Sequence, residues 1–248
     1  MRLTPLLFFI LLTHTCFKGS KVLVTLFAIE LGASPFVVGA LFATYSLFPA
    51  FLSIHAGKVS DRLGYRPPML VGACGLFGGL LIPFLYPTIT GLFLSAGIIG
   101  VFYIFYIVSI QHVVGTIGGE KDRTRNYSYY SIAVGVTALT GPTLTGFLIE
   151  GQGHELTFAL LALFPVVPIV ALAAARNARK QRPESKAEPG ERRFKDLVAS
   201  PSLRRVLVAA GIQESGNELV TFLLPIYCHA AGLSPSEIGL VMGAYGAA

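Results

Sequence analysis

Seven long apolar segments are the feature that most limits what this chain can fold into. A bilayer core about 30 Å thick is crossed by about 20 apolar residues in an α-helix. By that measure the sequence predicts membrane spans near residues 3–29, 36–56, 67–87, 91–113, 127–149, 156–175 and 203–228, and an eighth that begins near residue 236. Only 13% of the 248 residues are charged and the mean hydropathy is +0.67, whereas soluble domains carry about 25% charged residues. We therefore expect an all-α membrane protein.

The basic residues indicate how these helices are oriented. If the N-terminus is cytoplasmic, the cytoplasmic segments are 1–2, 57–66, 114–126 and 176–205, and they hold 17 of the 19 Lys and Arg residues. The opposite loops hold none and carry acids such as Glu30, Glu150 and Glu155. Because positively charged loops stay in the cytoplasm, we expect a multi-pass protein of the plasma (cell inner) membrane. The same bias explains the net charge of +6, so no nucleic-acid partner is implied.

Composition also suggests how the chain is divided. The stretch from Arg176 to Ser200 is rich in Arg, Lys, Glu and Pro, which is typical of a solvated linker. We expect a six-helix bundle over 1–175, a cytoplasmic linker over 176–202, and the start of a second bundle over 203–248. Three cysteines, Cys16, Cys74 and Cys228, lie in apolar runs without ligand-like spacing, so no metal or cofactor is expected. A signal peptide at the N-terminus is an alternative interpretation of the first apolar run.

A turn recurs at an offset of 200 residues. The sequence from Gly32 to Gly39, GASPFVVG, aligns with GLSPSEIG from Gly232 to Gly239, and Tyr45 aligns with Tyr245. Each copy joins an odd-numbered helix to the next one, so the seventh and eighth helices repeat the first and second. Parallel repeats are a transporter architecture in which the substrate binds near the membrane midplane between two halves. A turn motif that simply recurs before a helix is the alternative, since Pro commonly begins helices.

A charged, glycine-containing loop follows the second predicted helix. Its sequence, GKVSDRLGYR over 57–66, resembles the G-x-L-a-D-R-x-G-R-K signature between helices 2 and 3 of the major facilitator superfamily. Val59 and Tyr65 depart from the signature, and the residues that match it are Gly57, Asp61, Arg62, Gly64 and Arg66. The resemblance implies a transporter of about twelve helices, in which this loop braces two halves in the outward-open state. It also implies that this chain holds the first bundle and the start of the second. A generic basic loop is the alternative.

The fifth predicted helix carries a second, partial resemblance. Residues 137–146, TALTGPTLTG, are similar to the G-x-x-x-G-P-x-x-G-G element of the superfamily's exporters, with matches at Gly141, Pro142 and Gly146. A Gly-Pro pair also suits an ordinary kinked or closely packed helix. The fourth helix departs from the family, because residues 91–113 lack the arginine that many proton-coupled members carry there. Side chains that are candidates to line a cavity are Tyr45, Tyr103, Tyr106, Tyr130 and Gln213.

Two basic residues, Lys18 and Lys21, lie inside the first predicted helix rather than in a loop. A charge at the bilayer centre costs roughly 2.5–3.5 kcal/mol on insertion scales, so such residues normally face a water-filled path or a partner. His14 shares their face of the helix, because the three positions have i, i+4, i+7 spacing. Lysines that extend toward the membrane surface are the alternative.

The seventh predicted helix offers the opposite charge. Gln213, Glu214, Asn217 and Glu218 form a polar stripe, and the 200-residue offset places Glu214 opposite His14 and Glu218 opposite Lys18. The family resemblance implies that helices 1 and 7 meet across the outer half of a central cavity. We therefore expect Lys18 or Lys21 to pair with Glu218 or Glu214 and to help close an outer gate, with His14 and the glutamates as candidates for protonation. A static ion pair is the alternative.

Together these features predict a secondary transporter that moves a small solute by alternating access, and no catalytic residues. Proton-coupled efflux of small organic molecules is slightly favoured over uptake of a sugar or another metabolite by symport. The expected partners are a small-molecule substrate, protons and the lipid bilayer, with a monomer as the functional unit. A seven-helix receptor and a membrane-embedded enzyme are rival classes. The internal repeat and the start of an eighth span disfavour the receptor. The one candidate cluster for an enzyme is His14 with Glu214, and its spacing fits a gate better.

Overall fold

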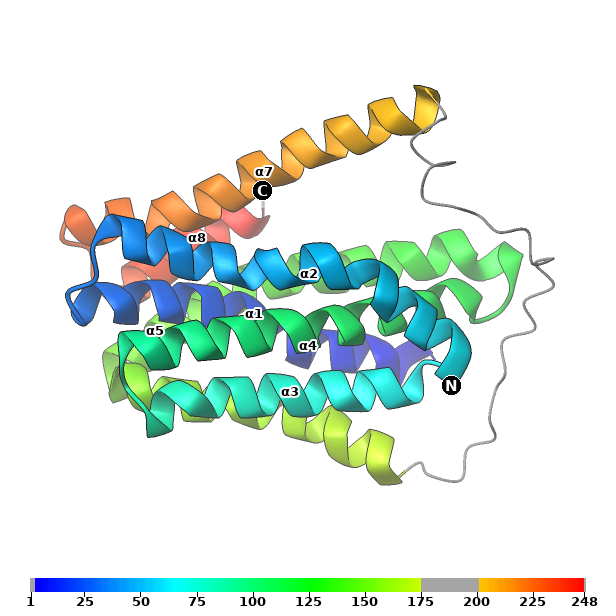
Figure 1. The fold of residues 1–248 in the computed structure, drawn as a ribbon, viewed down its shortest axis with the longest axis horizontal. Coiled ribbons are helices and arrows are strands. Elements are labelled where there is room, and N and C mark those ends of the chain that lie inside the picture. Colours follow the sequence, from blue (N-terminus) through cyan, green and yellow to red (C-terminus); the bar gives the residue numbers. More distant parts are fainter. Residues whose placement is uncertain (1–2, 175–200, 248) are drawn as a thin grey trace.

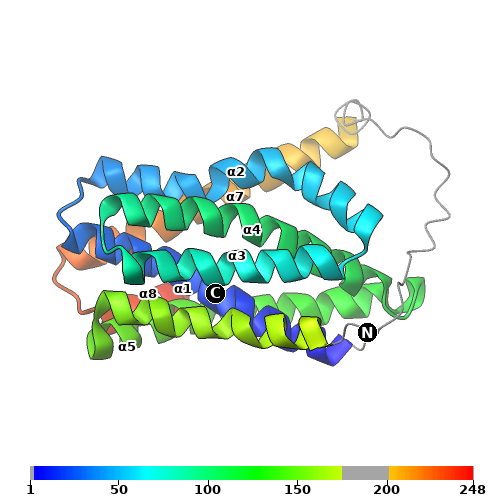
Figure 2. The same ribbon diagram turned by 60° about the horizontal axis from the view of Figure 1, so that its bottom comes forward.

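The computed structural model describes residues 3–174 and 201–247. These residues form helices α1 (Leu3–Glu30), α2 (Pro35–Leu63), α3 (Arg66–Leu85), α4 (Ile89–Thr116), α5 (Glu120–Ala174), α7 (Pro201–Ala230) and α8 (Pro235–Ala247). The helices lie side by side along the long axis of the molecule, and the turns gather at its two ends (Figures 1 and 2). The expected all-α membrane fold is confirmed. Most of the predicted linker, residues 176–200, lies outside the described residues.

The fifth and sixth predicted spans occur within the single element α5. Its backbone is helical except at Gly153, where φ is 79° and ψ is 171°, and there the chain turns back on itself (Figure 2). A positive φ is accessible to glycine because it has no Cβ atom. Both predicted spans therefore exist, but one glycine joins them instead of the longer connection that the sequence suggested.

Five helices of the described ranges are long and apolar enough to cross a membrane: α1, α2, α3, α4 and α5. Because α5 reverses at Gly153, it provides two passes. The 30-residue helix α7 is long enough to span a bilayer but is not among these five. Its polar residues between 213 and 218 lower its hydropathy, and the same residues belong to the site described below.

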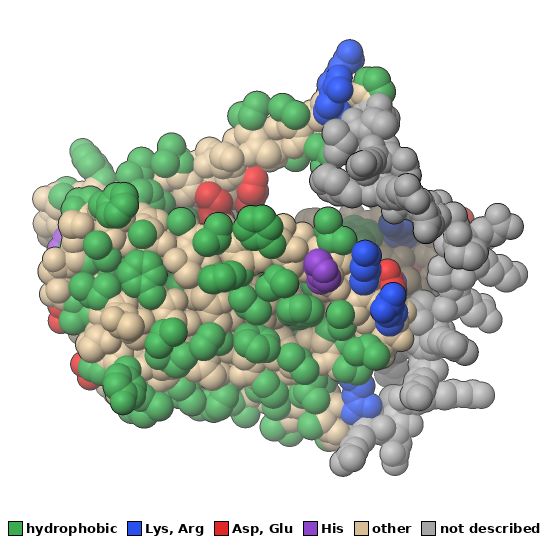
Figure 3. All heavy atoms as spheres, in the orientation of Figure 1, with side chains coloured by type: hydrophobic (Ala, Val, Ile, Leu, Met, Phe, Trp, Pro, Cys, Tyr) green, Lys and Arg blue, Asp and Glu red, His purple; other side chains and the backbone are tan. Residues whose placement is uncertain are grey.

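The two ends of the molecule differ in charge. At one end, which we call the basic end, lie the α2–α3 and α4–α5 turns and the start of α7 (Figure 1). It carries Lys58, Arg62, Arg66, Lys121, Arg123, Arg125, Arg204 and Arg205. In the space-filling view the Lys and Arg side chains that are visible gather at this end (Figure 3). The opposite, acidic end carries Glu30, Glu150, Glu155 and Glu237 and, among the described residues, no Lys or Arg.

The turns at 31–34 and 231–234 have the same hydrogen bonds. The amides of Gly32 and Gly232 each bond to the carbonyl three residues earlier, and those of Ala33 and Leu233 each bond to the carbonyl five residues earlier. Both glycines have positive φ, 76° and 83°. This is the Schellman arrangement that ends a helix at a glycine. The repeated sequence therefore folds into the same helix–turn–helix connection twice.

Helix α1 lies at the centre of the described bundle, and its closest neighbour is α5. A Cβ atom on Gly141 of α5 would lie 2.9 Å from both the Thr15 carbonyl oxygen and the Lys18 Cβ atom of α1. Further along α5, a Cβ atom on Gly239 of α8 would lie 2.7 Å from the Pro142 carbonyl oxygen and 3.0 Å from the Gly146 Cα atom. Such distances require glycine, and small residues are the usual means of close packing between membrane helices.

Candidate transport site between α1 and α7

A buried ion pair joins α1 to α7. The Lys21 Nζ atom donates hydrogen bonds to both carboxylate oxygens of Glu218, at 2.8 and 2.7 Å. The Lys21 side chain is only 4% exposed and that of Glu218 is 27% exposed. At 1.5 Å per residue, Lys21 lies about 14 Å from the end of α1 at Glu30, which is the third of the helix nearest the acidic end. A charge as deeply buried as that of Lys21 requires a partner, and Glu218 supplies it.

Aromatic rings surround this pair. The Lys21 ammonium group lies 4.8 Å from the centroid of Phe42 on α2 and 5.4 Å from that of Phe17 on α1. Phe42 packs at 5.6 Å against Phe222, which follows Glu218 by one turn of α7. Rings at these distances attract a cation through their negative faces. The pair therefore lies in an apolar enclosure formed by helices of both predicted halves.

About two turns closer to the basic end, His14 packs against Tyr103 of α4. The Tyr103 hydroxyl lies 2.8 and 2.9 Å from the two ring nitrogens of His14, and the rings meet edge to face. Tyr103 also stacks on Phe17, with centroids 3.6 Å apart. Of the predicted cavity tyrosines, Tyr103 therefore contacts both His14 and Phe17. His14 is buried and bonded to Tyr103 of α4 rather than to Glu214.

The sequence left open which of the two lysines meets which glutamate. The structure pairs Glu218 with Lys21 and not with Lys18, which the 200-residue offset aligns with this carboxylate. The reason is the direction of the side chains around α1. Lys18 leaves the helix against Gly141 of α5, while Lys21 lies beside Phe42 of α2, next to α7. Neither Lys18 nor Glu214 forms an ion pair within the described residues.

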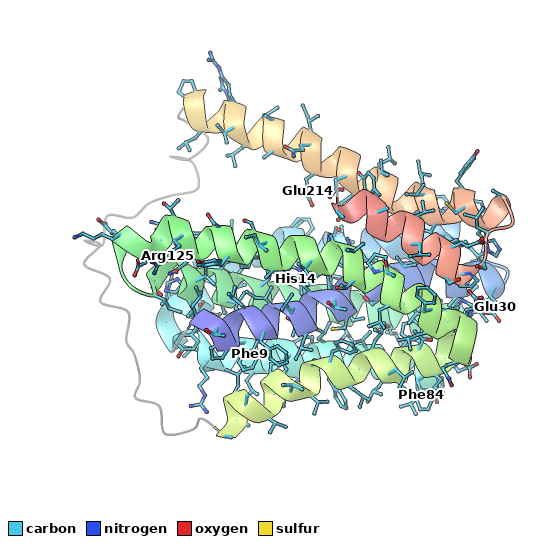
Figure 4. All side chains as sticks on the ribbon, turned by 180° about the vertical axis from the view of Figure 1, so that it is seen from behind. Phe9, His14, Glu30, Phe84, Arg125 and Glu214 are labelled. Carbon is cyan, nitrogen blue, oxygen red and sulfur yellow. The ribbon has the colours of Figure 1, made fainter. Side chains whose placement is uncertain are left out.

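The remaining polar residues of α7 lie around an open space. Asn217 accepts a hydrogen bond from Tyr245 of α8 at 3.2 Å, and Gln213 and Glu214 are exposed. The residues of α7 from Leu203 to Gly216 are all exposed, and the space-filling view shows an opening between this half of α7 and the bundle. Acidic side chains of α7 face that opening (Figure 3), and Glu214 lies on the side of α7 nearest the bundle (Figure 4).

The other predicted cavity tyrosines bond to protein groups. Tyr45 is buried and donates to Ser20 at 3.2 Å, and buried Tyr106 donates to the Phe9 carbonyl oxygen at 3.5 Å. Tyr130 accepts a hydrogen bond from Gln111 at 3.0 Å. Tyr45 and Tyr106 thus contribute to the packing of α1 against α2 and α4.

The charged loop motif lies at the basic end and contacts helices α4 and α5. Gly64 ends α2 with a φ of 77°, and the Arg66 guanidinium donates to the Leu172 carbonyl oxygen at the end of α5. Asp61 lies 3.6 Å from the Nδ1 atom of His112 on α4. Gly57 and Arg62 are in open surroundings, with nothing within 4 Å of a Cβ atom at Gly57. Within the described residues the motif therefore braces α2 and α3 against α4 and α5.

Comparison with known proteins identifies the family. Residues 6–248 match the family model described as Major Facilitator Superfamily. This chain belongs to the major facilitator superfamily. The predicted resemblance is confirmed, and the superfamily is one of transporters rather than enzymes.

Two curated proteins are similar to parts of the chain. The inner membrane transport protein YajR of Escherichia coli K12 is 29% identical over 133 residues, which are 53% of this chain and 29% of YajR. Multidrug resistance protein 1 of Bacillus subtilis 168 is 22% identical over 214 residues, which are 86% of this chain and 55% of that protein. The chain thus spans about half or less of the length of these two relatives.

Two solved transporter structures share the fold. A POT family transporter in complex with a thioalcohol-conjugated peptide superimposes with a TM-score of 0.65 at 20% identity, covering 95% of this chain and 48% of that one. The peptide transporter POT in complex with sulfate gives a TM-score of 0.63 at 17% identity and covers 96% of this chain and 49% of that one. At these identities the likeness shows the major-facilitator arrangement of helices and nothing about substrate.

A second cluster of ionisable groups links helices at the acidic end. The Nδ1 atom of His154, next to the Gly153 turn, lies against the Glu30 carboxylate, and its ring stacks on Phe27. The two residues line a shallow pocket of about 300 Å³ that Phe84 and Glu155 also border. Sequence reasoning missed this cluster, because His154 and Glu30 are 124 residues apart and neither stands in a motif.

This cluster predicts a dependence of stability on pH. Burial lowers the pKa of His154 below its ordinary value, nearby His229 lowers it further, and Glu30 opposes both. The unfolded chain therefore binds a proton at His154 more readily than the folded chain does, and stability should fall as the pH drops below about 6.5. We expect His154→Gln to show a smaller loss of melting temperature between pH 7.5 and pH 5.5 than the wild type, in detergent. His55→Gln, on the exposed face of α2, is the matched control, and equal pH slopes for wild type and His154→Gln would contradict the prediction.

Proposed function

We propose that this chain forms the first bundle and the start of the second bundle of a secondary transporter that moves a small organic solute by alternating access. The Lys21–Glu218 ion pair carries the proposal. It is buried, it joins α1 of one half to α7 of the other, and it lies in the third of α1 nearest the acidic end. A contact between halves at that depth suits an outer gate that opens when the halves rock apart.

The opening at the basic end supports the same mechanism. There α7 lies apart from the bundle, whereas at the acidic end the ion pair, the Phe42–Phe222 contact and the α5–α8 packing hold the halves together. The gathering of described Lys and Arg residues at the basic end favours a cytoplasmic location for that end. With this orientation the described conformation is closed toward the outside and open toward the cytoplasm.

Coupling to protons, with a slight preference for efflux, completes the proposal. Glu214 and Glu218 line the opening or the gate, and carboxylates that exchange between a buried ion pair and water are suited to binding and releasing protons. The similarity to a protein named for multidrug resistance and the match at Gly141, Pro142 and Gly146 favour export.

Proteoliposomes test this coupling. With the protein reconstituted and a substrate gradient imposed, we expect substrate-dependent movement of protons in the opposite direction, reported by an internal pH-sensitive dye. Glu218→Gln should reduce proton movement per substrate by at least about tenfold, because the amide cannot titrate. Glu120→Gln, at the start of α5 and away from the site, is the matched control. Proton movement in the same direction as the substrate would instead indicate uptake by symport, and solute flux without proton movement would refute the coupling.

A further inference from the structure

The first bundle places two cations at the site and no anion. Lys18 and Lys21 lie within α1, while the acidic residues of α1–α5 in the described ranges all lie at helix ends or beside the Gly153 turn. These acids are Glu30, Asp61, Glu120, Asp122, Glu150 and Glu155. The carboxylate that pairs with Lys21 therefore comes only from α7.

Separation of α7 from α1 would leave this charge without a partner. With α7 in place Lys21 is 4% exposed, and the rings of Phe17 and Phe42, which belong to α1 and α2, stay beside it when α7 moves. An uncompensated buried charge is strongly unfavourable. An anion that enters when α7 moves away would remove that cost, and a neutral or cationic solute would not.

The part of α7 that fills the site also shows what shape of molecule fits there. Glu218 brings a carboxylate to Lys21, and Phe222, one turn later, lays its ring against Phe42. A Cβ atom on Gly39 would lie 3.3 Å from the Phe222 ring, so the absence of a side chain at Gly39 makes room for it. Residues at i and i+4 are about 5–6 Å apart at their Cβ atoms. An anionic group and an aromatic ring thus occupy the site together, separated by a short aliphatic distance.

We propose that the α1–α2 face of this site binds small aryl carboxylates, whose anionic group replaces the Glu218 carboxylate on Lys21 and whose ring replaces Phe222 against Phe42 and Gly39. This inference rests on the proposed function, because it requires α7 to leave the site during transport. Glu218 and Phe222 then act as an internal competitor for the substrate. Substrate binding and closure of the gate are mutually exclusive at Lys21.

Equilibrium binding tests the inference separately from transport. The probes are 3-phenylpropionate, its neutral amide 3-phenylpropionamide and the cation 3-phenylpropylamine, measured by calorimetry on the purified protein in detergent. We expect Glu218→Gln to raise the affinity for 3-phenylpropionate by about tenfold or more, equivalent to about 1.4 kcal/mol or more, because it removes the competing carboxylate. The amide should show no such gain. Lys21→Met added to Glu218→Gln should abolish the gain, and Lys21→Arg should retain it.

Further variants guard against loss of folding. Phe222→Ala removes the ring that packs on Phe42 but keeps the ion pair, and it should also raise the affinity for 3-phenylpropionate. Glu120→Gln, the control, should leave this affinity unchanged. Unchanged binding of 3-phenylpropionate in both Glu218→Gln and Phe222→Ala would overturn the inference, as would tighter binding of the amine than of the carboxylate. Such a result would leave the proposed transporter function intact if the wild type still shows proton-linked solute movement in proteoliposomes. Absence of that movement in the wild type would instead count against the proposed function.

Discussion

Lys21→Glu and Glu218→Lys are each expected to open the acidic end, where the ion pair joins α1 to α7. The double variant, which reverses both charges, is expected to restore the closed acidic end. Each single reversal places like charges at the 2.7 Å contact in an apolar enclosure. Breaking a buried pair typically costs 3–5 kcal/mol, and we expect about 3 kcal/mol here because Glu218 retains 27% exposure. A change of that size shifts a two-state equilibrium by more than about a hundredfold.

Spin labels at Ala33 and Ala231, in the two repeated turns at the acidic end, would report this equilibrium. The wild type and the double reversal should give one short distance, whereas each single reversal should give a longer distance or two populations. Glu120→Lys, a reversal far from the pair, is the control. If the single reversals keep the wild-type distance, the ion pair does not hold the halves together and the outer-gate assignment is wrong.

A single added methyl group at Gly239 is expected to separate α8 from α5. The new Cβ atom would lie 2.7 Å from the Pro142 carbonyl oxygen and 3.0 Å from the Gly146 Cα atom. These are backbone atoms of a packed helix, which cannot rotate away as a flexible side chain does. Overpacking of this kind costs about 1–3 kcal/mol, and we expect Gly239→Ala to lower the free energy of unfolding in detergent by that amount.

Gly135→Ala is the matched control for this substitution. Gly135 also lies within a membrane helix, α5, but a Cβ atom there would meet nothing within 4 Å. The same chemical change should be neutral or stabilise the helix by up to about 1 kcal/mol, because alanine favours helix more than glycine does. Equal effects of the two substitutions would mean that helix propensity, and not contact between α5 and α8, decides the outcome.

Much of the architecture follows directly from the sequence. Hydropathy predicted most helix ends to within a few residues, since burying a helix in lipid requires a continuous apolar run. The paired GxSP turns were recognisable because a positive φ at Gly32 and Gly232 admits few other residues. The charged loop identified the family, because its residues stand at fixed spacing in one short segment. Lys21 and Glu218 were recognisable as site residues because charges inside apolar helices are costly.

Other features depend on tertiary structure. The sequence left open which lysine meets which glutamate, because the rotation of α1 against α5 and α2 decides where each side chain points. Two contacts join residues that are 124 or more positions apart: the Phe42–Phe222 ring contact and the His154–Glu30 contact. A local sequence pattern cannot predict contacts between such distant residues. Hydrophobicity and turn geometry are local properties of the chain, so the sequence alone determined the helices, their turns and the buried charges. The choice of partner for each charge arises only when the helices pack, so only the tertiary structure decided it.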